Sequence, residues 1–199
     1  MSIVGYMTDH KQSEPQTHTN ALGMVEFNSI AVGIEATDAM LKVSQVELIV
    51  AKTICSGKYI AIVKGDTAAV RSSVERGRNV GSNAYVDDFI IPNLHPQVFS
   101  AFVASTEQPK IDALGILETF SVASCVLAAD RAAKTAQVTL MEIRMGIGIG
   151  GKAFFTMTGD VAAVRSALEA GAMVAREVGL LVRKVLIPQP REEIFNSLS

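Results

Sequence analysis

The sequence has no tryptophan, two cysteines and three histidines among its 199 residues. Two cysteines are too few for a disulfide framework, so we expect a reducing compartment such as the cytosol. No apolar run approaches the roughly 20 residues of a membrane-spanning helix, so neither a transmembrane helix nor a membrane partner is expected. The N-terminus also lacks the basic and apolar segments of a secretory signal.

Blocks of charge are absent as well. The net charge is −2 and the basic residues are dispersed, which argues against a nucleic-acid partner. Aromatic residues make up 6% of the chain, and alanine, valine, isoleucine and glycine are common. This composition favours flat, tightly packed surfaces over a deep aromatic-lined pocket.

Residues 1–20 are polar and without periodicity, which predicts a flexible N-terminal tail. His10 and His18 lie in this segment. Because a flexible tail gives them no fixed partners, we interpret both as solvated side chains and not as metal ligands.

The rest of the chain is a repeat. The segment ALGMVE at 21–26 returns as ALGILE at 113–118, and GDTAAVRS at 65–72 returns as GDVAAVRS at 159–166. The offset between the copies is 92 at Gln45 and 94 from Gly57 onward, so two residues were inserted in one short stretch. We predict a first domain at 21–104, a linker at 105–112 and a second domain at 113–199. Function is expected where the copies differ.

The residue pattern of each copy predicts the order strand, helix, strand, loop, strand, helix, strand. In the first copy we expect strands at 21–27, 46–54, 58–63 and 85–91. Helices are expected from the cap Ser29 to about Val43 and from the cap Asp66 onward, with Val70 and Val74 inward and with Ile30, Ile34 and Leu41 broadly on one face. The second copy repeats this with caps Ser121 and Asp160 and with strands at 138–144, 153–157 and 180–187, and a short helix is expected around 98–103. The predicted fold class is α/β, an α+β sandwich in which both helices cover one face of a mainly antiparallel sheet.

Several short motifs in this framework resemble one family. They are ALGMVE opening the first strand, DAMLK at 38–42 followed by VEL at 46–48, SGK at 56–58, GD at 65–66, and Ile-Pro ending each copy. The chain is similar to the bacterial microcompartment shell proteins over residues 21–96 and 113–190. Because the elements follow in the ordinary order in both copies, it resembles the tandem-domain, non-permuted subgroup, and within it the T-type shell proteins of propanediol-utilisation compartments.

This resemblance implies an assembly and its partners. Members of the subgroup form pseudohexameric trimers in which two domains per chain surround a central pore. We therefore expect a homotrimer that packs with other shell proteins in a hexagonal layer, located in the cytoplasm as part of a microcompartment shell. A lysine at the motif position of Lys42 and Lys134 lies at the tile edge in this family, so both are expected to make lateral assembly contacts. The family's arginine after Ile-Pro is replaced by Asn93 and Gln189.

The resemblance also implies that the loop between the second and third strands lines the pore. The copies diverge in this loop, which reads TICSGK at 53–58 and MGIGIGGK at 145–152. The residues expected to line the pore are Ile54, Ser56, Gly57, Gly146, Gly148, Ile149 and Gly150.

Cys55 is the candidate metal ligand in this loop. Three-fold symmetry brings one residue per chain together on the axis, so three Cys55 thiolates would hold a [4Fe–4S] cluster whose fourth iron takes an exogenous ligand. In the T-type relatives the matching cysteine binds such a cluster, and we expect the same cofactor here, shared by three chains. Ser56 stands where the T-type relative has proline, and the loss of proline leaves the loop less rigid. A zinc ion on three thiolates and water is a further option. Cys125, inside a helix, is predicted to be a packed core thiol.

Other candidate sites are weaker. GxGxxG at 146–151 is followed by a predicted strand and not by a helix, which argues against a nucleotide site. Cys55 and His95 lack a third group for nucleophilic catalysis. Glu26 and Glu118 hold equivalent positions, which favours a structural role in each copy.

The sequence therefore predicts a structural shell protein and not an enzyme. In the favoured interpretation, the cluster at the pore transfers electrons across the shell or is delivered to an encapsulated redox enzyme. The alternative is a metal-free pore tile for small polar metabolites. A third possibility is a soluble ligand-binding sensor built on a duplicated α/β sandwich.

Overall fold

The computed structural model describes residues 20–54, 57–103, 112–145 and 151–196, the side chains of residues 195 and 196 excepted. The predicted tail at 1–20 and linker at 105–112 lie almost wholly outside these ranges, so both stay predictions. None of the described helices is long and apolar enough to cross a membrane.

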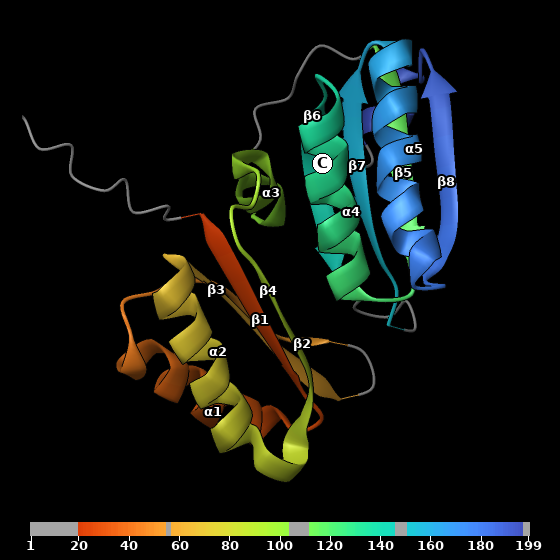
Figure 1. Cartoon of the computed structure of the whole chain (residues 1–199). Coiled ribbons are helices and arrows are strands. Elements are labelled where there is room, and N and C mark those ends of the chain that lie inside the picture. Colours follow the sequence, from red (N-terminus) through yellow and green to blue (C-terminus); the bar gives the residue numbers. More distant parts are fainter. Residues whose placement is uncertain (1–19, 55–56, 104–111, 146–150, 197–199) are drawn as a thin grey trace, which may run out of the picture.

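Both units have the predicted order of elements, and in each unit the two long helices cover one face of a four-stranded sheet (Figure 1). The first unit consists of β1 (Ala21–Phe27), α1 (Ile30–Val43), β2 (Glu47–Ile54), β3 (Lys58–Gly65), α2 (Thr67–Gly81), a 3-10 turn (Ser82–Ala84), β4 (Tyr85–Ile91) and α3 (Pro96–Phe102). The second consists of β5 (Ala113–Thr119), α4 (Val122–Thr135), β6 (Thr139–Met145), β7 (Ala153–Gly159), α5 (Val161–Glu177), β8 (Leu181–Pro188) and α6 (Glu192–Asn196).

The two sheets have the same topology. Their strand orders are β2-β3-β1-β4 and β6-β7-β5-β8, and every neighbouring pair is antiparallel. The edge strand of each sheet carries a register shift at the same place, between Leu48 and Val50 in β2 and between Leu140 and Glu142 in β6. The predicted α+β sandwich and its duplication are confirmed.

The four predicted helix caps are confirmed by their hydrogen bonds. Ser29 and Ser121 accept from the backbone N–H groups of Val32 and Ser124, three residues further on. Asp66 and Asp160 do the same at the start of α2 and α5. A side-chain oxygen at this position satisfies an N–H group that has no partner within the helix, which explains why all four helices begin where the sequence predicts.

Helix α1 does not pack through its large apolar residues. Ile30, Ile34 and Leu41 are exposed, and the buried face consists of Gly33, Ala36, Thr37 and Met40. A Cβ atom at Gly33 would lie 2.6 Å from the Tyr59 ring, so the helix approaches the sheet closely because this residue is small. The apolar face identified from the sequence therefore points away from the core of its own unit.

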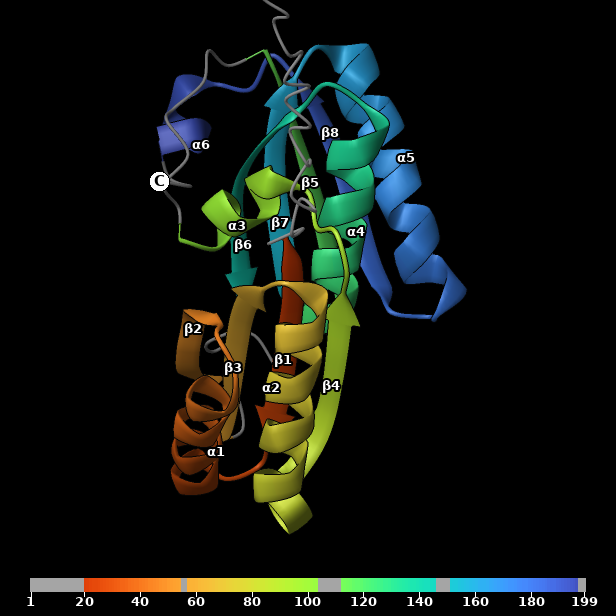
Figure 2. The same cartoon turned by 60° about the vertical axis from the view of Figure 1, so that its left-hand side comes forward.

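The outer face of the first sheet, opposite α1 and α2, is covered by α3 and by the second unit. Leu22, Met24, Ile60 and Ile62 from this face belong to a hydrophobic cluster that continues through α3 into α4 and β6. Figure 2 shows α3 between the two units, beside β6. The two units are thus joined by a continuous apolar core as well as by the chain.

Helices α4 and α5 approach each other more closely than α1 and α2 do, as the surroundings of the equivalent glycines Gly77 and Gly171 show. A Cβ atom at Gly171 of α5 would lie 2.8 Å from the backbone oxygen of Ala128 in α4, whereas at Gly77 of α2 it would meet the flexible Met40 side chain. We expect the free energy of unfolding of Gly171→Ala to be lower than that of Gly77→Ala by about 1–3 kcal/mol. The reason is that a backbone atom moves aside less easily than a methionine side chain does. Thermal and urea unfolding of the two variants at one protein concentration measure this. Equal stabilities would contradict it.

Candidate functional site

The divergent loops are described only at their ends. Cys55, Ser56, Gly146, Gly148, Ile149 and Gly150 lie outside the described residues, and their assignment to the pore stays a prediction. Gly57 and the equivalent Gly151 both have positive φ, 72° and 81°, and no atom lies within 4 Å of a Cβ placed on either. Both loops therefore re-enter the sheet through a glycine in the left-handed region, with open space beside it.

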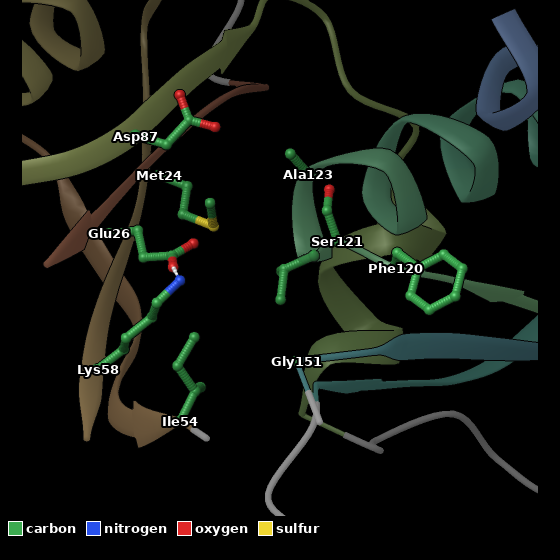
Figure 3. A pocket seen from close by; sticks show the side chains of 10 residues that line it. Met24, Glu26, Ile54, Lys58, Asp87, Phe120, Ser121, Ala123 and Gly151 are labelled. Atoms are coloured by element: carbon green, nitrogen blue, oxygen red, sulfur yellow. Dashed lines mark hydrogen bonds and ion pairs between the residues drawn. The ribbon is translucent and has the colours of Figure 1, made fainter. Parts of the chain in front are cut away.

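Ile54, at the other end of the first loop, lines a cavity of about 280 Å³ between the two units (Figure 3). On the side of the first sheet, its wall contains Met24, Glu26, Lys58 and Asp87. The opposite wall comes from the second unit, at the start of α4 and at the end of its divergent loop, with Phe120, Ser121, Val122, Ala123 and Gly151. The junction between the units is thus hollow next to the loops.

The charged residues beside the cavity in the first sheet differ from those at the equivalent positions of the second sheet. Lys58 Nζ lies 2.6 Å from Glu26 Oε1, and Asp87 pairs with Glu26 across β1 and β4. In the second unit Lys152 lies 3.0 Å from Glu118, but Arg183 occupies the place of Asp87. Each copy therefore keeps the same carboxylate–ammonium pair, which supports a structural role for Glu26 and Glu118. The third charge is reversed.

Among the described residues, no three His, Cys, Asp or Glu side chains lie together as a metal site. Cys125 is fully buried, and burial raises the pKa of its thiol far above the usual value, opposed in part by a hydrogen bond to Thr119. A thiol that stays protonated at neutral pH is a poor metal ligand. The prediction of a core thiol is confirmed, and Cys55 is left as the candidate ligand.

Polar contacts bind the chain after β4 to the second unit. The backbone N–H of His95 donates to Asp130 Oδ1 at 2.8 Å, and Lys134 donates both to Asp130 Oδ2 and to the carbonyl oxygen of Asn93. The backbone N–H of Leu140 in β6 donates to the side chain of Gln97 in α3 at 2.8 Å. These bonds border the apolar contact between the units.

Lys42 and Lys134 occupy equivalent helix ends but have different surroundings. Lys42 bonds Asp38 one turn back on an exposed face, whereas Lys134 bonds both Asp130 and the carbonyl oxygen of Asn93 in the first unit. The lateral role expected for both stays a prediction. No role was expected for Asp38 or Asp130, although an Asp–Lys pair at i, i+4 occurs in both copies of the sequence.

The outer face of the second sheet is more polar than that of the first. Glu142 and Thr156 replace Val50 and Ile62, and in the described part of the chain one carboxylate oxygen of Glu142 and the hydroxyls of Thr156 and Thr158 are buried without a hydrogen-bond partner. Burial raises the pKa of Glu142, and Arg144, which bonds it at 2.9 Å, opposes that shift. The buried position therefore disfavours the ionised form of Glu142 relative to its protonated form.

This shift predicts a pH dependence. Because the pKa of Glu142 is higher in the folded than in the unfolded state, its contribution to stability is complete below the unfolded pKa and is lost as pH rises through the folded pKa. We expect Glu142→Gln, which keeps an acceptor for Arg144 but cannot ionise, to gain stability relative to wild type between pH 4 and pH 7. Thermal unfolding of both proteins across this range is the measurement, and a difference that does not change with pH would contradict the prediction.

Comparison with known proteins identifies the repeat. The BMC domain family matches the chain twice, at residues 21–94 and 113–190. The bacterial microcompartment shell protein PduT of Citrobacter freundii is 42% identical over 180 residues, which are 90% of this chain and 98% of PduT. The carboxysome assembly protein CcmO of Synechocystis is 30% identical, over 94% of this chain and 67% of CcmO.

Solved structures agree. A microcompartments protein from Desulfitobacterium hafniense is 57% identical, with a TM-score of 0.87 over 88% of this chain and 98% of that one. A fused permuted hexameric shell protein from the RMM microcompartment shares the fold at 18% identity, with a TM-score of 0.56. Both units therefore have counterparts in a solved microcompartments protein. The chain belongs to the BMC domain family, and it is a structural shell protein of bacterial microcompartments and not an enzyme.

Proposed function

We propose that the chain forms a homotrimeric shell tile whose central pore holds a [4Fe–4S] cluster on Cys55 of three chains. The observation that carries this proposal is the position of Cys55 in the loop where the two copies diverge, at a strand end that borders the junction between units. A single chain offers one such thiol, so the ligand set is complete only in a three-fold assembly.

Two properties of the chain support this donor set. Thiolates are the usual ligands of iron–sulfur clusters, and Cys125 is excluded as a competing ligand by its burial. The resemblance to T-type shell proteins, in which the matching cysteine binds a cluster, points the same way. Ser56 in place of proline makes the loop a weaker support for the ligand.

In this proposal the protein holds and orients the cluster. A bound cluster would supply one-electron transfer across the shell, or would itself be delivered to a redox enzyme inside. Cys55 provides the thiolates. Gly57, with its positive φ, leads the chain from the loop that contains Cys55 into β3. The Glu26–Lys58 pair fixes the start of β3.

A second candidate function is a metal-free pore tile for small polar metabolites. The cavity beside Ile54 favours it, because its walls carry Glu26, Lys58 and Asp87 and could offer hydrogen bonds to a polar molecule near the loop. The two candidates share the trimer and the shell, and they differ in whether Cys55 holds metal.

Iron and acid-labile sulfide in anaerobically purified protein decide between them. We expect about four irons per trimer, with the visible absorption and EPR signals of a cluster, because three chains share one [4Fe–4S] group. Cys55→Ser should lose the iron while remaining a trimer. Cys125→Ala is the matched control and should keep it.

Absence of iron from wild type, even after reconstitution with iron and sulfide, would contradict the cluster and leave the metal-free pore. Iron retained in Cys55→Ser would show that the ligand had been wrongly assigned.

The reactivity of the two thiols gives an independent check. In cluster-free folded protein, we expect a thiol reagent to label Cys55 within minutes and Cys125 only after unfolding, because Cys125 is buried and protonated. Mass spectrometry of the labelled chain counts the modified sites. Rapid labelling of the Cys55→Ser variant in the folded state would contradict the buried-thiol assignment.

A further inference from the structure

Lysines in the described part of the chain are paired with carboxylates, with one exception. Six of the seven lysines in these ranges form an ion pair, and they are Lys42, Lys58, Lys64, Lys134, Lys152 and Lys184. The seventh is Lys52 on β2, whose ammonium group has neither an ion pair nor a hydrogen bond with the described residues. Within these ranges Lys52 is therefore the lysine without a counter-charge.

The second copy has the partner that Lys52 lacks. The residue equivalent to Lys52 is Arg144, which pairs at 2.8 Å with Glu142, two residues earlier on the same strand. In the first copy Val50 stands at the position of Glu142. The first copy thus keeps the cation on this strand but has no carboxylate beside it.

The side chains next to Lys52 on the outer face of the first sheet are apolar. Ile60 lies directly opposite on β3, and Val50 and Ile54 lie two residues away on β2, on the same face. Ile60 is fully buried, and the other two are partly buried against the hydrophobic cluster. In the second copy Phe154 takes the place of Ile60, and its ring centre lies 5.8 Å from the guanidinium carbon of the paired arginine. The three apolar side chains have no acceptor to offer the charge of Lys52.

Such surroundings change the reactivity of an amine. Desolvation favours the neutral form of a lysine, whereas a nearby carboxylate favours the charged form. Burial accordingly lowers the pKa of Lys52. The neutral amine carries a lone pair and attacks electrophilic carbon, which the ammonium ion cannot do. Because β2 is an edge strand and Lys52 is partly exposed, a small molecule can reach its nitrogen.

We propose that Lys52 is a modification site at which the chain takes up small aldehydes as an imine. The lone pair of the neutral nitrogen attacks the carbonyl carbon, and one proton of the amine moves to the carbonyl oxygen. The hydroxyl group so formed leaves with the second proton of the amine as water, and a C=N bond remains. The step needs neither an oxidant nor a reductant.

A small uncharged carbonyl compound fits this position better than an anion does. A lone ammonium group is a weak anion site, since Val50, Ile54 and Ile60 offer no further side-chain donor. The carbon chain of an aldehyde can instead lie against these residues and shield apolar surface from water. The proposal does not depend on the cluster or the trimer, because all of its residues belong to one chain.

Reductive ethylation of the wild-type protein tests the proposal. The folded protein is treated with limiting acetaldehyde and with cyanoborohydride, which reduces the imine and fixes it, and peptide mass spectrometry gives the ethylation rate of each lysine. At neutral pH we expect Lys52 to react several-fold faster than Lys42, which is more exposed but paired with Asp38. The difference should disappear in urea-unfolded protein, and it should shrink as the pH is raised towards the range where all lysines are neutral.

Two results of this experiment would overturn the proposal. The first is a Lys52 that reacts no faster than Lys42 in the folded protein at neutral pH. The second is a faster Lys52 whose advantage is the same at every pH, because accessibility and not a neutral amine would then explain the rate.

A pair of variants tests the cause. Val50→Glu places on β2 the acid that Glu142 supplies on β6, and it should abolish the rate advantage of Lys52. Leu48→Glu is the matched control, because Leu48 lies on the same strand but on the helix side of the sheet, and it should leave the advantage intact. Circular dichroism reports whether each variant is folded. An advantage retained by folded Val50→Glu would overturn the proposal.

Discussion

The outer face of the first sheet must be covered, and the rest of the molecule depends on how this is done. Leu22, Met24, Ile60 and Ile62 are apolar on a face that their own helices do not reach, and all four are buried by α3 and the second unit. Leaving four such side chains in water would cost several kcal/mol, at roughly 1.5–3 kcal/mol each. This contact fixes the second unit against the first and creates the hollow junction beside the divergent loops.

Duplication gives each unit a short helix after its last strand, α3 after β4 and α6 after β8. Helix α3 packs against β6 of the second unit and so belongs to the contact that joins the units. The copies differ, among other places, at the loop with Cys55, at Asp87 against Arg183, and at the buried polar residues around Glu142.

The sequence predicted the order of elements, the helix caps and the family, because these depend on local signals such as Ser29 and Asp66 and on repeated motifs. It did not predict which face of α1 is buried. Ile30, Ile34 and Leu41 have helical spacing, but Gly33 and Ala36 allow the closer approach to the sheet. Asp130 was missed because its role appears only when Asn93 and His95 are placed beside α4.

The central claim is that the second unit is fixed against the first, and hydrogen–deuterium exchange at the His95 amide tests it most directly. This amide donates to Asp130 Oδ1 at 2.8 Å across the junction. The account predicts that the His95 amide is protected in the folded wild type and becomes fast-exchanging in Asp130→Ala. Exchange at the rate of an unstructured peptide in the wild type would contradict it.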